Sequence, residues 1–193
     1  MSKPPRPGAA NRVRIIGGTW RGRRIAFGDR GGLRPTPDRV RETVFNWLAP
    51  WLPGARVLDL FAGSGAFGFE ALSRGATVAL LVDRDPRIIR ELQQQGRALG
   101  ATGACYRCAE ALAFLQGAAE PFDLVFLDPP YGRGLLAPCS RALETGGWLA
   151  DPAHVYLEAE LGLVPELPPG WELLRSKQAG AVAYHLARRT AAD

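Results

Sequence analysis

The sequence predicts an α/β fold: a doubly wound, mostly parallel Rossmann-like sheet with an antiparallel C-terminal hairpin and a small basic N-terminal β-hairpin extension. From residue 55 onward, apolar runs of strand length alternate with segments of helical period, which is typical of parallel strands joined by helices. A glycine-rich turn follows the first of these strands, and the last two strand-like segments are separated by a short turn. The length of 193 residues suits one domain with a full core.

The N-terminal part reads as a tail followed by an extension. Residues 1–11 are rich in Pro, Gly and small side chains, so we expect a disordered tail. Residues 12–50 form the predicted basic extension, and residues 51–193 the main domain. Two short strands, 13–16 and 24–27, flank a glycine-containing loop that displays Trp20, Arg21 and Arg23. A basic loop that carries an aromatic ring suits RNA, because the ring can stack on an unpaired base.

A helix completes the extension. Thr36 is a good N-cap, Pro37 suits the first helical position, and Asp38 favours the positive end of the helix dipole. Apolar residues at helical spacing predict its buried face: Val40, Val44, Phe45 and Leu48. Four polar residues cannot all share that face, so some should border a cleft: Arg39, Arg41, Glu42 and Asn46.

The main domain alternates strand and helix. Strands are predicted at residues 56–60, 77–82, 103–108, 122–127 and 154–160, and helices at 66–74, 86–99, 110–116 and 136–144. A hairpin is predicted from residues 171–177 and 181–188, joined at 178–180.

Composition indicates a soluble protein, and we expect a cytoplasmic monomer. No stretch approaches the roughly 18 apolar residues of a membrane span, and the first residues lack the apolar core of a signal peptide. Three cysteines fit a reducing compartment. Cys105 and Cys108 have C-x-x-C spacing, but the remaining candidate ligands are scattered singly, so we expect no metal site.

Charge is distributed unevenly along the chain. Residues 1–41 contain eleven basic and two acidic side chains, a net charge of +9, whereas the remainder carries −4. A basic arm on a mildly acidic body is typical of a nucleic-acid binder. Ten of the eleven basic residues are arginines, which grip phosphate bidentately and stack on bases. A solvated basic tail is the alternative reading.

The segment Asp128-Pro129-Pro130-Tyr131 follows a buried strand and stops it abruptly, because proline removes a backbone donor. The carboxyl end of a strand in an open α/β sheet is where ligands bind. A planar amine under the ring of Tyr131 could donate one hydrogen to Asp128 and the other to the carbonyl of Pro129. The motif therefore indicates chemistry on the amino group of a nucleic-acid base, although alone it could be a strand-ending turn.

The turn after the first main-domain strand carries a nucleotide-binding pattern. Gly63, Gly65 and Gly68 form G-x-G-x-x-G between a strand and a helix, and Asp83 ends the next strand where an acid can bind ribose hydroxyls. Gly68 could instead serve close packing of helix on strand. The loop alone does not separate NAD from S-adenosylmethionine. Asp59 favours the latter, because a carboxylate there can face an amino-acid cation but would repel a pyrophosphate.

Together these motifs resemble the class I, S-adenosylmethionine-dependent amino-methyltransferases. More narrowly, the chain resembles the bacterial 16S rRNA (guanine(966)-N(2))-methyltransferase family. The segments that carry the narrower resemblance are Arg14–Gly18 with Arg21–Arg24, Leu33–Leu48, Val57–Ala76 and Val182–Tyr184. The similarity runs from about Arg12 to Arg189.

The resemblance implies roles for individual residues. Asp59, Phe61, Gly63 and Gly65 would hold the methionine half of S-adenosylmethionine, and Asp83 its ribose. Glu110 and Ala111 would meet its adenine, although many relatives carry Asp or Asn at the first position. Asp128, Pro129, Pro130 and Tyr131 would be catalytic. Thr36, Arg34 and Arg39 would border the cofactor or the RNA, and the remaining RNA contacts would come from Arg14, Trp20, Arg21, Arg23 and Arg24.

The implied partner is 16S rRNA in the small ribosomal subunit, and the implied reaction methylates the N2 amine of one guanine. Glu70 belongs to the resemblance but is equally well explained as a structural carboxylate. The alternatives are a DNA adenine-N6 methyltransferase, which shares the glycine loop and Asp-Pro-Pro-Tyr, a non-catalytic RNA-binding assembly factor, and an NAD-dependent oxidoreductase. Protein glutamine methylation is disfavoured, because that group usually has Asn in place of Asp128.

Overall fold

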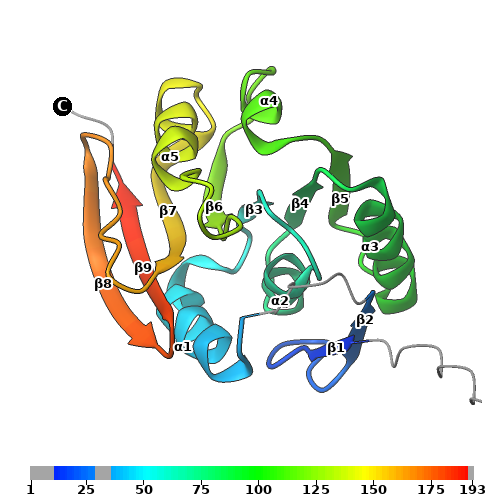
Figure 1. The fold of residues 1–193 in the computed structure, drawn as a ribbon. Helices are drawn as coiled ribbons and strands as arrows, with labels where there is room; N and C mark the ends of the chain where they lie inside the picture. The colour runs from blue at the N-terminus through cyan, green and yellow to red at the C-terminus, as the bar shows by residue number, and fades with distance from the viewer. Residues whose placement is uncertain (1–10, 29–35, 191–193) are drawn as a thin grey trace, which may run out of the picture.

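The computed structural model describes residues 11–28 and 36–190, and its main sheet lies between two layers of helices (Figure 1). The sheet has the order β5-β4-β3-β6-β7-β9-β8. Its strands are β3 (Arg56–Asp59), β4 (Val78–Asp83), β5 (Ala104–Cys108), β6 (Phe122–Leu127), β7 (Leu149–Glu160), β8 (Trp171–Ala179) and β9 (Val182–Arg189). Strands β3 to β7 pair in parallel, and β9 pairs antiparallel with both β7 and β8. The predicted fold class is confirmed.

The helices cover both faces of the sheet. They are α1 (Asp38–Leu48), the short 3-10 helix η1 (Ala49–Trp51), α2 (Ala66–Ser73), α3 (Pro86–Leu99), α4 (Ala111–Leu115) and α5 (Leu136–Thr145). One core cluster joins the sheet to α1, α2 and α3, and the other joins it to α4 and α5. Val57 and Leu58 belong to different clusters, because consecutive strand residues point to opposite faces.

The order of the strands places a topological switch point between β3 and β6, where folds of this class usually bind their ligand. From β3 the chain winds outward through β4 to β5, and then returns to place β6 on the other side of β3. At such a switch point the loops after the two strands leave in opposite directions, which opens a crevice at the carboxyl edge of the sheet. The residues after β3 and β6 are therefore well placed to share a ligand.

The N-terminal hairpin, β1 (Asn11–Arg14) and β2 (Arg24–Phe27), lies beside α2 and α3 (Figure 1). Its apolar residues Val13, Ile15, Ile25 and Phe27 belong to the same core cluster as α1 and α2. The strand begins at Asn11, so that residue does not belong to a disordered tail as predicted; the rest of the predicted tail lies outside the described residues.

Two local predictions were wrong for physical reasons. Thr36 is not the N-cap of α1; Pro37 holds that position and no side chain caps it. Of the four polar residues of α1 from which cleft residues were expected, Arg41 is fully buried and bonded to Asp38. Strand β7 begins at Leu149 rather than at residue 154, since Phe122 on β6 pairs with Leu149 before an irregularity in the register.

Candidate active site

Three carboxylates lie at one edge of the sheet, as the sequence led us to expect. Asp59 ends β3, Asp83 ends β4, and Asp128 directly follows β6. Repulsion from Asp83 raises the pKa of Asp59, and repulsion from Asp59 raises the pKa of Asp128, so the three carboxylates lie close to one another. The structure thus places the glycine loop and the Asp-Pro-Pro-Tyr motif after neighbouring strands at the same edge of the sheet, and the crevice expected at this switch point lies between them.

The glycine loop connects β3 to α2 with a tight turn. Gly63 and Gly65 adopt φ of +48° and +76°, and Gly65 occupies the N-cap of α2. The Gly63 N–H donates to Asp83 Oδ2 at 3.1 Å, which ties the loop to the end of β4. Gly68 packs α2 onto the sheet, because a Cβ there would lie 2.9 Å from Leu81 Cγ. The sequence left two interpretations of Gly68, part of a nucleotide-binding pattern or close packing of helix on strand, and the structure shows the close packing.

Asp59 is a buried carboxylate that has no ion pair among the described residues. Its side chain accepts the Gly68 N–H at 3.0 Å, and the residue is 2% exposed. Burial raises its pKa from 3.8 to about 7, repulsion from Asp83 adds to the rise, and the Gly68 hydrogen bond opposes it. A buried carboxylate of this kind attracts a cation and repels a pyrophosphate.

The remaining predicted cofactor residues are partly engaged by the protein. Asp83 accepts from the N–H groups of Gly63 and Asp85, and burial raises its pKa. Glu110 is exposed and caps α4 by accepting the Ala113 N–H at 3.0 Å. Ala111 is buried at the start of that helix, and Phe61 packs against the second core cluster.

The Asp-Pro-Pro-Tyr segment leaves the sheet as predicted. Pro129 is buried, Pro130 is exposed, and Tyr131 is 48% exposed. Burial raises the pKa of Asp128 well above its ordinary value, and repulsion from Glu158 and Asp59 raises it further. The ring of Tyr131 therefore stands at the surface beside a carboxylate that a hydrogen-bond donor would stabilise in its charged form.

Glu158 on β7 is a site residue that the sequence reasoning missed. It is 4% exposed and accepts hydrogen bonds from three hydroxyls, those of Thr36 at 2.9 Å, Tyr131 at 2.9 Å and Tyr156 at 2.7 Å. The Thr36 hydroxyl also lies 3.5 Å from Asp128 Oδ2 and so connects the two carboxylates. The available signal was a charged residue inside an otherwise buried strand, which points to a paired or functional group.

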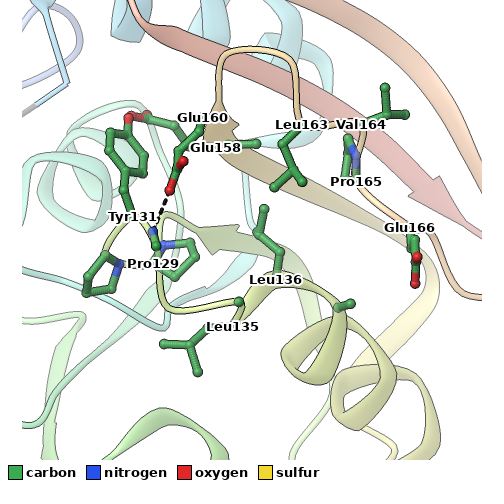
Figure 2. Close-up of a pocket in the computed structure, with 15 residues that line it drawn as sticks. Pro129, Tyr131, Leu135, Leu136, Glu158, Glu160, Leu163, Val164, Pro165 and Glu166 are labelled. Carbon is green, nitrogen blue, oxygen red and sulfur yellow. Dashed lines mark hydrogen bonds between the residues drawn. The ribbon is translucent and has the colours of Figure 1, made fainter.

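A cavity of about 220 Å³ adjoins this group (Figure 2). Figure 2 shows Leu135 and Leu136 on one side of the cavity and Leu163 and Val164 on the other, with Tyr131 and Glu158 at one end. Its lining is mostly apolar, and its charged residues are all acidic: Glu158, Glu160 and Glu166. This lining suits an uncharged planar ring better than a phosphate.

The predicted RNA-contacting residues lie mainly on the surface of the extension. The exposed ones are Arg14, Arg21, Arg23, Arg24 and Arg39. Trp20 is half-buried and packs against the core, so only part of its ring faces solvent. Arg34 lies outside the described residues.

Glu70 fastens the extension to the main domain. This buried α2 carboxylate accepts the N–H groups of Ile16 and Gly17, each at 2.7 Å, and pairs with Arg74 at 2.7 Å. A Cβ at Gly18 would lie 1.7 Å from the Ser73 carbonyl oxygen, so the loop approaches α2 more closely than another residue would allow. These contacts give Glu70 a structural role and position the basic loop relative to the crevice.

Within the described part of the chain, no group of three or more His, Cys, Asp or Glu residues could hold a metal ion. Cys105 and Cys108 are free and exposed, and Cys139 is free and buried. None of the helices among these residues is long and apolar enough to span a membrane.

The fold and the site together define a Rossmann-like methyltransferase of the doubly wound α/β class. The chain belongs to the family described as Conserved hypothetical protein 95, which it matches over residues 13–188. It is 49% identical to Ribosomal RNA small subunit methyltransferase D of Escherichia coli (strain K12), over 99% of this chain and 96% of that protein.

Solved structures agree with this assignment. A putative methyltransferase, yhhF, from Escherichia coli superposes with a TM-score of 0.86 at 48% identity, covering 94% of this chain and 100% of that one. A putative methylase, HI0767, from Haemophilus influenzae superposes with a TM-score of 0.82 at 37% identity, again covering 94% and 100%.

Proposed function

We propose that this protein transfers a methyl group from S-adenosylmethionine to the exocyclic N2 amine of one guanine in 16S rRNA of the small ribosomal subunit. The observation that carries the proposal is that Asp128, Pro129 and Tyr131 lie next to Asp59 and the glycine loop at the switch point of the sheet. The rRNA substrate is supported by the relatives, whose name specifies small-subunit ribosomal RNA.

The residues around the glycine loop fit S-adenosylmethionine, which supplies an electrophilic methyl group on a positively charged sulfur. Asp59 would hold its amino group, because this buried carboxylate has no ion-pair partner among the described residues and gains from a cation. Asp83 would accept from the ribose hydroxyls with the lone pairs left by its two backbone donors. Glu110 would accept from the adenine amine while it still caps α4.

Asp128 and the Pro129 carbonyl act on the guanine amine. The nitrogen lone pair is delocalised into the ring, so the amine is a poor nucleophile. Hydrogen bonds from the amine to these two acceptors would draw the nitrogen towards tetrahedral geometry and localise the lone pair. The amine must lose one proton as it gains the methyl group, and Asp128 would accept that proton. Acceptors fixed in a partly buried site need little reorganisation during the reaction. Tyr131 would stack on the base, which must leave its helix to reach the site.

The exposed arginines of the extension would hold the RNA backbone. Arg21, Arg23 and Arg24 lie in the hairpin that Glu70 fastens beside α2, so they are fixed relative to the crevice. Phosphate contacts position an RNA without reading its sequence. Selection of one guanine therefore has to come from the shape of the RNA and from groups inside the crevice.

The test is methyl transfer from labelled S-adenosylmethionine to small ribosomal subunits that lack the modification, with free 16S rRNA and duplex DNA in parallel. We expect label in the rRNA and none in DNA. Label in DNA adenine would keep the catalytic site but exclude the proposed substrate. Cofactor binding without transfer to any substrate would favour the non-catalytic assembly factor.

A further inference from the structure

Glu158 has an acceptor position to spare on the oxygen nearest the Tyr131 hydroxyl. An ionised carboxylate accepts about four hydrogen bonds, two at each oxygen. Among the described residues, Oε2 accepts from both Thr36 and Tyr156, whereas Oε1 accepts only from Tyr131. The side chain lines the cavity beside Pro129 and Tyr131 (Figure 2).

The position of Glu158 relative to Asp128 is fixed by protein contacts. Both carboxylates lie within reach of the Thr36 hydroxyl, at 2.9 Å and 3.5 Å. The Tyr156 hydroxyl on β7 itself and the Tyr131 hydroxyl in the loop after β6 also hold Glu158. Two hydrogen-bond acceptors of the same kind thus stand side by side next to the Tyr131 ring.

Guanine and adenine differ in what stands beside the exocyclic amine. In guanine the carbon that bears N2 also bears N1–H, so two adjacent nitrogens donate. In adenine the ring nitrogen beside the amine carries a lone pair, which a carboxylate repels. A site with two adjacent carboxylates therefore matches guanine and opposes adenine.

We propose that Glu158 is a specificity-determining residue whose Oε1 accepts the N1–H of the target guanine while Asp128 accepts from the neighbouring N2 amine. This inference rests on the proposed function and deepens it. The Tyr131 hydroxyl bond to Oε1 fixes the orientation of the ring on whose face the base would stack. Glu158 would then separate this site from adenine-methylating sites that share Asp-Pro-Pro-Tyr.

The test compares guanine with 2-aminopurine, which keeps the N2 amine but lacks O6 and has an unprotonated N1; the change of the ratio in the variant then reports the contact at N1. Small subunits are reconstituted with 16S rRNA that carries either base at the methylated position, and kcat/KM is measured for the wild type and Glu158→Gln. The wild type should prefer guanine by about 10- to 100-fold, the size expected for a hydrogen bond to a charged group. Glu158→Gln should lower this ratio at least about tenfold, because its amide can donate to N1 of 2-aminopurine.

The ratio distinguishes recognition from a structural role. Loss of positioning alone would slow both substrates by the same factor, and an unchanged ratio in Glu158→Gln would overturn the proposal. Equal rates on both bases by the wild type would also overturn it. Glu172→Gln, an exposed β8 carboxylate, is the matched control and should keep the wild-type ratio.

A second variant tests the same proposal if Glu158→Gln does not fold. Glu158→Asp keeps the charge but withdraws the carboxylate, and it should also lower the guanine preference. Absence of transfer by the wild type to guanine-bearing subunits would overturn the proposed function itself, whereas transfer with an unchanged ratio would overturn only the role of Glu158.

Discussion

Asp59→Asn should make the protein more stable while it abolishes cofactor binding. The pKa of Asp59, about 7 against an ordinary 3.8, means that its charge is destabilised in the folded state. Three pKa units correspond to about 4 kcal/mol at a pH above both values. The new amide brings a buried donor whose unmet hydrogen bonds cost about 1–3 kcal/mol. The expected net gain is therefore about 1–3 kcal/mol near pH 8.

The sign of the pH dependence follows from the raised pKa. Between about pH 4 and pH 7 the unfolded chain is ionised at this residue while the folded chain still binds the proton, so the wild type loses stability as pH rises. The advantage of Asp59→Asn should consequently be largest above pH 7 and smaller near pH 5. Asp59→Asn also removes the repulsion between Asp59 and its neighbours Asp83 and Asp128, so the measured difference combines the charge of Asp59 with this coupling.

Urea denaturation at the two pH values measures the difference, and calorimetry measures S-adenosylmethionine binding. Glu172→Gln, on the exposed face of β8, should change the free energy of unfolding by no more than about 0.5 kcal/mol. If folded Asp59→Asn is less stable than the wild type near pH 8, then the charge of Asp59 does not destabilise the folded state, and if it still binds the cofactor normally, Asp59 does not hold the cofactor.

Three further predictions concern the chemistry, the RNA surface and the extension. Methyl transfer should slow as pH falls, because Asp128 must be ionised and its pKa is raised by burial and by Glu158. Glu158→Gln should therefore move the acidic limb of the pH–rate profile to lower pH. An unmoved limb would contradict the repulsion between Glu158 and Asp128. Replacing Arg21 and Arg23 with Ala should weaken subunit binding and flatten its salt dependence while leaving cofactor affinity unchanged, as filter binding and calorimetry would show. Glu70→Ala should lower the free energy of unfolding by about 3–5 kcal/mol, because Arg74 and buried Arg41 each lose this carboxylate and the N–H groups of Ile16 and Gly17 lose their acceptor. A loss below about 1 kcal/mol in urea would exclude the fastening role.

The sequence was sufficient to predict the parallel sheet and the position of three carboxylates at its carboxyl edge. Alternation of strand and helix implied a parallel sheet, and parallel strands bring their carboxyl ends to one edge, so Asp59, Asp83 and Asp128 had to lie near one another. The glycine turn and the two prolines mark the ends of β3 and β6 by local backbone chemistry. Both signals depend only on residues a few positions apart.

The positions of Thr36 and Glu158 beside Asp128 depend on contacts between distant segments. Thr36 lies 122 residues from Glu158 in the chain and 92 from Asp128, and no local pattern relates them. Thr36 has the side chain of a good N-cap and was therefore predicted to begin a helix, but its hydroxyl donates to Glu158 instead. The sequence did not show that Arg41 is buried, because nothing near it in sequence reveals Glu70, which lies 3.7 Å from its guanidinium.

The most direct test of the central claim is identification of the methylated nucleoside in small subunits treated with the wild type and with Asp128→Ala. The rRNA is digested and the product is identified and mapped by mass spectrometry. We expect N2-methylguanosine at a single position with the wild type. Asp128→Ala should lose turnover and retain cofactor binding. A methyl group on another atom or base, or near wild-type turnover by Asp128→Ala, would contradict the proposal.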